Sequence, residues 1–106
     1  MKKALIKIHN SPAGVFTEIT SKHYIFEYNE DYVAEPISLT MPVTKSKYEF
    51  HSFPSFFDGL LPEGIQLEAI LKRYKIDKHD YFEQLLITGS DLVGAVTVQS
   101  MENDSE

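Results

Sequence analysis

The chain has 106 residues, 42% of them hydrophobic and 25% charged, which is the size and composition of one globular domain with one core. It has no cysteine, so disulfide frameworks, thiolate catalysis and cysteine-bound zinc are excluded. Its formal charge of −6 argues against independent binding to nucleic acid, because such binding depends on neutralising phosphates.

The N-terminal residues 4–9 are short, apolar and β-branched, and they predict a first strand. Lys7 and His9 interrupt this run too early for a signal peptide, and no stretch approaches the roughly 18 apolar residues of a membrane span. We therefore expect a cytoplasmic protein. A dense turn signal at 10–14 and an alternating run at 15–19 together predict a hairpin with a longer loop.

Three aromatic residues, Tyr24, Phe26 and Tyr28, follow at a period of two and predict a third strand with one aromatic face. Residues 37–41 alternate again and predict a fourth strand. Residues 48–50, next to a lysine-rich loop, predict a short edge strand. An antiparallel meander is the arrangement that this order favours.

The central residues 53–64 combine an apolar run with a tightly shaped turn. We expect Phe53, Phe56, Phe57 and Leu60 to contribute to the core. Pro62 suits the first turn of a following helix, where a missing N–H is harmless and where the negative charge of Glu63 is favourable.

The helix after Pro62 has an apolar stripe, Leu67, Ile70, Leu71 and Tyr74, which we expect to face the sheet. Ile65 lies two residues before Leu67, about 160° around a 3.6-residue helix, so it falls outside the stripe. The sequence therefore predicts an apolar side chain near solvent just after the turn.

Asp80, with Glu83 three residues later, resembles a capping box and predicts a second helix that ends at Gly89. Residues 95–99 predict the last strand, with valines that suit a sheet interior. The fold class is α+β: a small antiparallel or mixed sheet of about five strands against two to three short helices. We expect one domain at 1–100 and an acidic, disordered tail at 101–106.

The patterns that suggest chemistry have simpler explanations. Residues 89–94 have the glycine spacing of a phosphate-binding loop, but Ala95 and Val96 stand where lysine and serine or threonine are needed. Gly89 is better explained as a helix C-cap and Gly94 as a close backbone approach. The histidines are widely separated, without metal-ligand spacing: His9, His23, His51 and His79.

Asp58 and Glu63 could form an acid–base pair, but five residues apart around a turn they are better explained as capping groups. No serine has a nucleophile-elbow context. We therefore predict no catalytic, cofactor-binding or metal-binding residue and no enzymatic activity.

Four blocks in one order carry a resemblance to a known family: residues 24–28, 37–42, 56–64 and 89–96. The chain resembles the N-terminal subdomain of HipA-type toxin kinases, and especially the stand-alone HipS-type antitoxin of three-component HipB–HipS–HipT systems of bacteria. The resemblance implies a subdomain that rests on a Ser/Thr kinase without carrying catalytic machinery. In agreement, the sequence has no H-R-D or D-F-G motif, and ending at Glu106 it leaves no room for a kinase fold.

The resemblance also implies partners. HipT-like kinases, which phosphorylate aminoacyl-tRNA synthetases, receive this subdomain as a separate chain, and a HipB-like helix-turn-helix protein supplies DNA binding. The expected function is neutralisation of the kinase by docking next to its active site. The alternatives are a non-catalytic subunit of a split kinase, required in trans for its activity or stability, and a domain that only links the kinase to the DNA-binding protein.

The kinase-binding residues that the resemblance implies lie in one short segment: Asp58, Leu61, Pro62, Glu63, Gly64 and Ile65. The family often has tryptophan where this chain has Ile65, and in HipS-like chains that residue is implicated in plugging the kinase active site. Isoleucine still fills an apolar pocket, but it buries less area than an indole and lacks its N–H.

Overall fold

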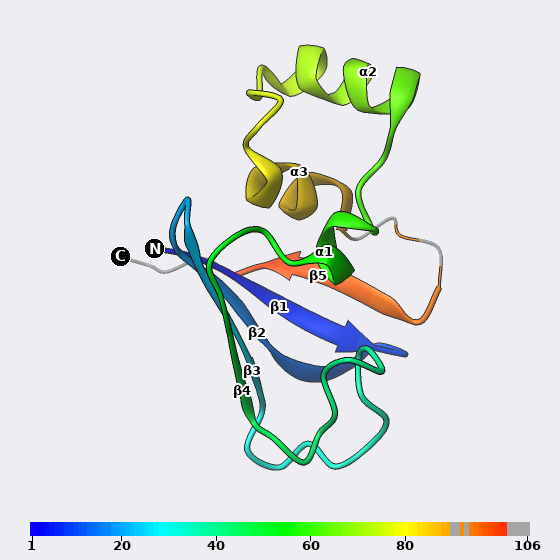
Figure 1. Cartoon of the computed structure of the whole chain (residues 1–106). Helices are drawn as coiled ribbons and strands as arrows, with labels where there is room; N and C mark the ends of the chain where they lie inside the picture. Colours follow the sequence, from blue (N-terminus) through cyan, green and yellow to red (C-terminus); the bar gives the residue numbers. More distant parts are fainter. Residues whose placement is uncertain (90–91, 93, 102–106) are drawn as a thin grey trace.

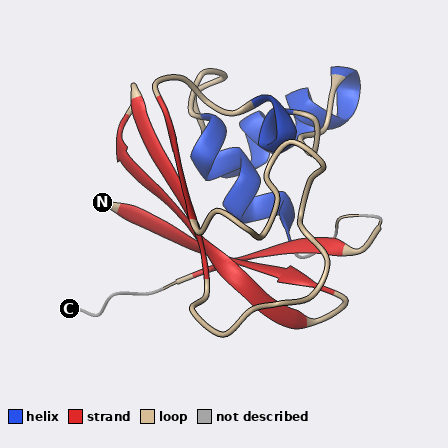
Figure 2. Ribbon diagram, turned by 60° about the horizontal axis from the view of Figure 1, so that its bottom comes forward, coloured by secondary structure: helices blue, strands red, loops and turns tan. Residues whose placement is uncertain are grey.

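A computed structural model describes residues 1–89, 92 and 94–101. It contains one antiparallel sheet in the order β4-β3-β2-β1-β5, with the helices over one face (Figures 1 and 2). The strands are β1 (Lys2–Ile8), β2 (Ser11–Thr20), β3 (His23–Tyr28), β4 (Lys47–Phe50) and β5 (Val96–Ser100). The helices are α1 (Ser55–Asp58), α2 (Gly64–Tyr74) and α3 (Tyr81–Thr88). The predicted α+β class is confirmed; residues 102–106 of the predicted tail lie outside the described residues.

The first hairpin is tighter than its sequence suggests. Ile8 pairs with Ser11, so only His9 and Asn10 form the turn, and their φ angles of 51° and 69° are those of a type I′ hairpin. The predicted longer loop is wrong because residues 11–14 belong to β2. The register shifts between Ile6 and Lys7, so Pro12 lies beside an irregularity where a residue without an N–H is tolerated.

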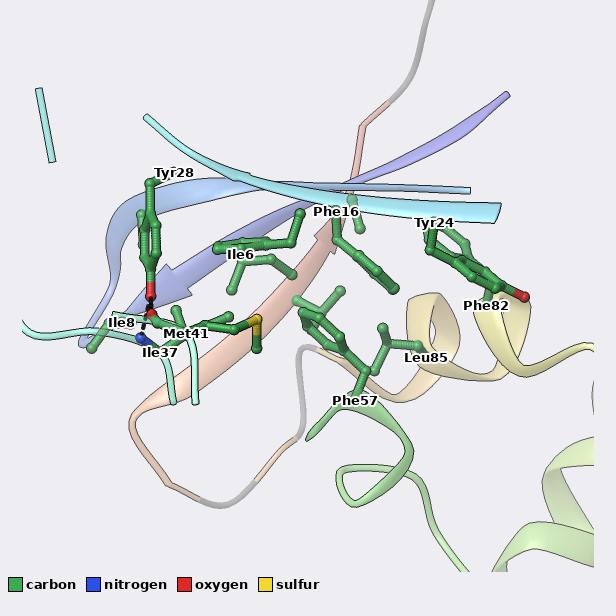
Figure 3. Close-up of a cluster of buried hydrophobic side chains, with 14 residues drawn as sticks. Ile6, Ile8, Phe16, Tyr24, Tyr28, Ile37, Met41, Phe57, Phe82 and Leu85 are labelled. Carbon is green, nitrogen blue, oxygen red and sulfur yellow. Dashed lines mark hydrogen bonds between the residues drawn. The ribbon is translucent and has the colours of Figure 1, made fainter. Parts of the chain in front are cut away.

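The predicted strand at residues 37–41 is also wrong, because this segment forms turns. Ile37 and Met41 are nevertheless buried, whereas Leu39 is 96% exposed. The Tyr28 hydroxyl holds the segment: it donates to the Met41 carbonyl at 2.5 Å and accepts from the Ile37 N–H at 3.0 Å (Figure 3). A side chain thus replaces the ladder partner that a strand would need. Burial raises the pKa of the Tyr28 hydroxyl.

Replacing Tyr28 with phenylalanine is expected to lower the free energy of unfolding by about 1–3 kcal/mol, because two buried backbone groups lose their partner. Urea denaturation measures the change. Tyr32→Phe is the control, since its hydroxyl bonds only to the exposed Glu35 carbonyl. Equal losses in the two variants would contradict the role given to Tyr28.

The core is built from stacked aromatic rings beneath the sheet. Phe16 of β2 lies 4.0 Å from Phe57 and 5.2 Å from Phe82, measured between ring centroids (Figure 3). Tyr24, Phe26 and Tyr28 are buried, so the predicted aromatic face of β3 is confirmed. α1, a single turn, inserts Phe57; the other core residues predicted from the central segment, Phe53, Phe56 and Leu60, are partly buried around it.

The capping of α3 is confirmed, because the Asp80 carboxylate accepts the Glu83 N–H at 3.3 Å. Gly89 occupies the C-cap position of α3, as predicted, whereas the close backbone approach predicted at Gly94 is wrong. A Cβ on Gly89 would meet Val98 of β5, so the close approach is there, whereas Gly94 has open space and a φ of +122°. β5 lies at the edge of the sheet and not in its interior, but the side chain of its Val98 is buried.

Candidate functional site

The presented turn, defined here as Leu61, Pro62, Glu63, Gly64 and Ile65, leaves the core directly after α1. The Leu60 and Leu61 N–H groups donate to the Phe57 and Asp58 carbonyls at 3.1 Å each, which turns the chain away from the sheet. Leu61 and Pro62 are half-buried, whereas Glu63, Gly64 and Ile65 are exposed. The turn is therefore anchored at its start and open at its end.

α2 begins later than the sequence suggests. Glu63 occupies the N-cap position with an extended backbone and no side-chain cap, so neither it nor Pro62 lies in the first helical turn as predicted. Gly64 has a φ of +61°, a conformation that glycine adopts without strain and that prevents the helix from extending back to Pro62. This geometry sets the direction in which α2 leaves the turn.

α2 does not face the sheet, so the prediction for its apolar stripe is wrong. None of its residues is buried: Leu67, Ile70 and Leu71 are half-buried and Tyr74 is 48% exposed. In Figure 1, α3 lies between α2 and the sheet. The physical reason is that Phe57 of α1 and Phe82 of α3 already fill the space beneath the sheet.

Ile65 is 84% exposed, which confirms the prediction that it lies outside the stripe. A large aliphatic side chain is thus held in solvent at the start of α2. Asp58, at the end of α1, is exposed as well. Within the described residues no hydrogen bond or ion pair joins Asp58 to Glu63, so the geometry does not support an acid–base pair.

A cleft of about 630 Å³ lies elsewhere, beside the N-terminus of β1 and the start of α3, and several charged residues are among those that line it. Lys2 bonds to Glu83 at 3.1 Å and lies 3.7 Å from Asp80. Burial alone would lower the pKa of Lys2, but the Glu83 bond and the Asp80 charge outweigh it and raise that pKa. Burial raises the pKa of the nearby Glu18 carboxyl. These contacts tie β1 to α3 and are adequately explained as structural.

The part of the chain that the structure describes offers neither a metal site nor a membrane-spanning helix. No group of three or more histidine or acidic side chains there is arranged to hold a metal ion. No described helix is long and apolar enough to cross a membrane. The exposed segment around Ile65 is therefore the feature of the fold that most needs a functional explanation.

Comparison with known proteins identifies the family. Residues 4–99 match the family model described as "HipA N-terminal domain". The chain belongs to this family. The solved structure titled "N-terminal domain of HipA toxin" has the same fold, with a TM-score of 0.77 and 25% identity over 98% of this chain and 96% of that one.

Two relatives of the HipA N-terminal domain described here differ in length. An "Uncharacterized protein" of Haemophilus influenzae is 35% identical over 74 residues, which is 70% of either chain. The "Putative kinase Y4dM" of Sinorhizobium fredii is 30% identical over 109 residues, covering 93% of this chain but 27% of the relative. The same domain thus occurs within a much longer chain that is named a putative kinase.

The presented turn was predicted from the sequence, but a neighbouring surface was not. Gln66, Ala69 and Arg73 of α2 line a groove shared with α3. Their helical spacing is visible in the sequence, but the groove depends on α2 lying over α3 and away from the sheet. Because α2 was predicted to lie against the sheet, the groove could not be predicted.

Proposed function

We propose that this HipA N-terminal domain is an antitoxin that binds a HipA- or HipT-like Ser/Thr kinase and neutralises it by docking next to the active site. The observation that carries the proposal is Ile65, an aliphatic side chain 84% exposed at the end of an anchored turn. Asp58 and the presented turn form the contact surface. The domain acts in the cytoplasm without catalytic residues of its own, within a ternary complex that includes a HipB-like helix-turn-helix protein.

The energetics of the presented turn support docking. Burying an isoleucine side chain in an apolar pocket contributes about 1.5–3 kcal/mol. Pro62 fixes one φ angle, and the bonds to the Phe57 and Asp58 carbonyls hold the turn's start, so little conformational freedom remains to be lost on binding. An ordered, exposed apolar residue is thus suited to an anchor role at an interface.

A second candidate is a non-catalytic subunit that a split HipA-like kinase requires in trans for its activity or stability. It is favoured by the relative named a putative kinase, in which the matching domain and the remaining sequence form one chain. The two candidate functions predict opposite effects on phosphorylation by the kinase. An antitoxin lowers phosphorylation by the kinase, and a complementing subunit raises it.

The test is a phosphorylation assay with a purified HipT-like kinase from the organism that supplies this chain. The unaltered domain is expected to suppress phosphorylation. Ile65→Asp is expected to raise the concentration needed for half-suppression by about 10- to 100-fold, because a carboxylate replaces the apolar anchor. The fold should be retained, since the side chain is exposed.

Leu39→Asp is the matched control, because Leu39 is also an exposed aliphatic residue, 96% exposed, but lies in a turn outside α2. Its effect on suppression should be small. Binding without suppression would sink the inhibitory role, and increased phosphorylation would favour the subunit role. Equal effects of Ile65→Asp and Leu39→Asp would remove Ile65 from the contact.

A further inference from the structure

A groove of about 560 Å³ runs between α2 and α3, on the side of α2 next to the presented turn. Its walls are largely apolar and include Leu60, Ile70, Tyr74, Ile87 and Leu92. Each of these side chains is half-buried or exposed. The apolar walls of the groove are therefore open to an external side chain.

Ile65 does not line the groove, but it lies one helical turn before Ala69, which does. Residues four apart on an α-helix lie about 40° from each other, so Ile65, Ala69 and Arg73 form one row along α2. Ala69 and Arg73 line the groove, and Pro62 lines its other end. A partner segment that contacts Ile65 can therefore reach the groove along the next two turns of the helix.

Arg73 is the charged residue in the described lining of the groove, and it belongs to a basic end of α2. Lys72 and Arg73 lie in the last turn of α2 and Lys75 caps it, whereas the whole chain has a net charge of −6. Among the described residues, no carboxylate lies within ion-pair distance of these three cations. The Arg73 guanidinium lies 5.5 Å from the Tyr74 ring centroid, and both side chains line the groove.

We propose that the groove is a second part of the kinase-binding surface and receives an apolar side chain flanked by an aspartate or glutamate of the kinase. The inference rests on the proposed function. Charge complementarity supports a kinase segment of this chemistry, because Arg73 can pair with the carboxylate while the walls enclose the apolar group. A symmetric pair of copies that share this groove would bring Arg73 from each copy into the contact with no carboxylate among the described lining residues to pair with it, which is unfavourable.

Isothermal titration calorimetry of the full chain with the purified HipT-like kinase tests the proposal. Ala69→Trp fills the groove and is expected to weaken binding about tenfold or more. Glu68→Trp places the same ring on an exposed position that does not line the groove, so binding should change less than about threefold. Circular dichroism and thermal unfolding establish that each variant is folded.

The charge is tested separately. Arg73→Glu is expected to weaken binding about tenfold, whereas Lys72→Glu, with the same charge change in the same helical turn, should have an effect below about threefold. The combined results separate the groove from the proposed function. If Ile65→Asp weakens binding while Ala69→Trp and Arg73→Glu do not, the groove proposal is overturned and the proposed function stands. If the kinase does not bind the unaltered chain, both are overturned. If the isolated chain is a dimer that Ala69→Trp dissociates, the groove is an interface between copies and the proposal is wrong.

Discussion

Replacing Phe57 with alanine is expected to destabilise the fold by about 3–5 kcal/mol, the range for removing a fully buried phenyl ring. Phe57 has no exposed surface, and its ring centroid lies 4.0 Å from that of Phe16 of β2 and 5.1 Å from that of Phe56 of the same short helix. A one-turn helix has few other contacts with which to close the cavity. The loss is a large fraction of the roughly 5–15 kcal/mol available to one domain.

Chemical denaturation followed by far-ultraviolet circular dichroism measures this loss. Phe56→Ala is the matched control, because it removes the same ring from the neighbouring position, where the side chain is only partly buried. The control is expected to cost less than Phe57→Ala. A similar cost at both positions would contradict the assignment of Phe57 as the residue that anchors α1.

Gly89→Ala is expected to have the second largest effect, a loss of about 1–3 kcal/mol or more from overpacking. The added Cβ would lie 2.6 Å from the Val98 backbone oxygen and closer still to the Val98 Cβ, so α3 and β5 would have to separate. Thermal unfolding of the variant measures the effect. The distance involves backbone atoms, which cannot move aside as a flexible side chain can.

Gly59→Ala is the control, because it measures the effect of replacing glycine with alanine where the added Cβ meets no close atom. Gly59 has a φ of −66° and its added Cβ would make only ordinary contacts at 3.5 Å. This substitution should be neutral or stabilising by about 0.4–1 kcal/mol through the unfolded chain. An unchanged unfolding temperature for Gly89→Ala would show that the α3–β5 contact relaxes without cost.

Local patterns in the sequence were sufficient where each residue's neighbours determine its environment. The alternation of Tyr24, Phe26 and Tyr28 predicted a buried strand face, and Asp80 with Glu83 predicted the start of α3. Residues 37–41 have a similar alternation but form turns, because Tyr28 bonds to their backbone from another element. A strand pattern does not reveal such a distant partner.

The candidate site shows the same division. Ile65 precedes Leu67 by only two residues, and this spacing was enough to place Ile65 outside the apolar stripe of α2 and to predict its exposure. The position of the stripe itself required knowledge of the volume beneath the sheet, which Phe57 and Phe82 occupy. The groove beside Ala69 and Arg73 could not be predicted for that reason, since it exists only where α2 lies over α3.

The absence of buried residues from α2 has a consequence for the evolution of this surface. Substitutions in a helix that contributes little to the core cost little stability, so they are not removed by selection for folding. The surface of α2 can therefore change while the residues that form the core stay the same. Recognition that depends on α2 and stability of the fold are thereby carried by different residues.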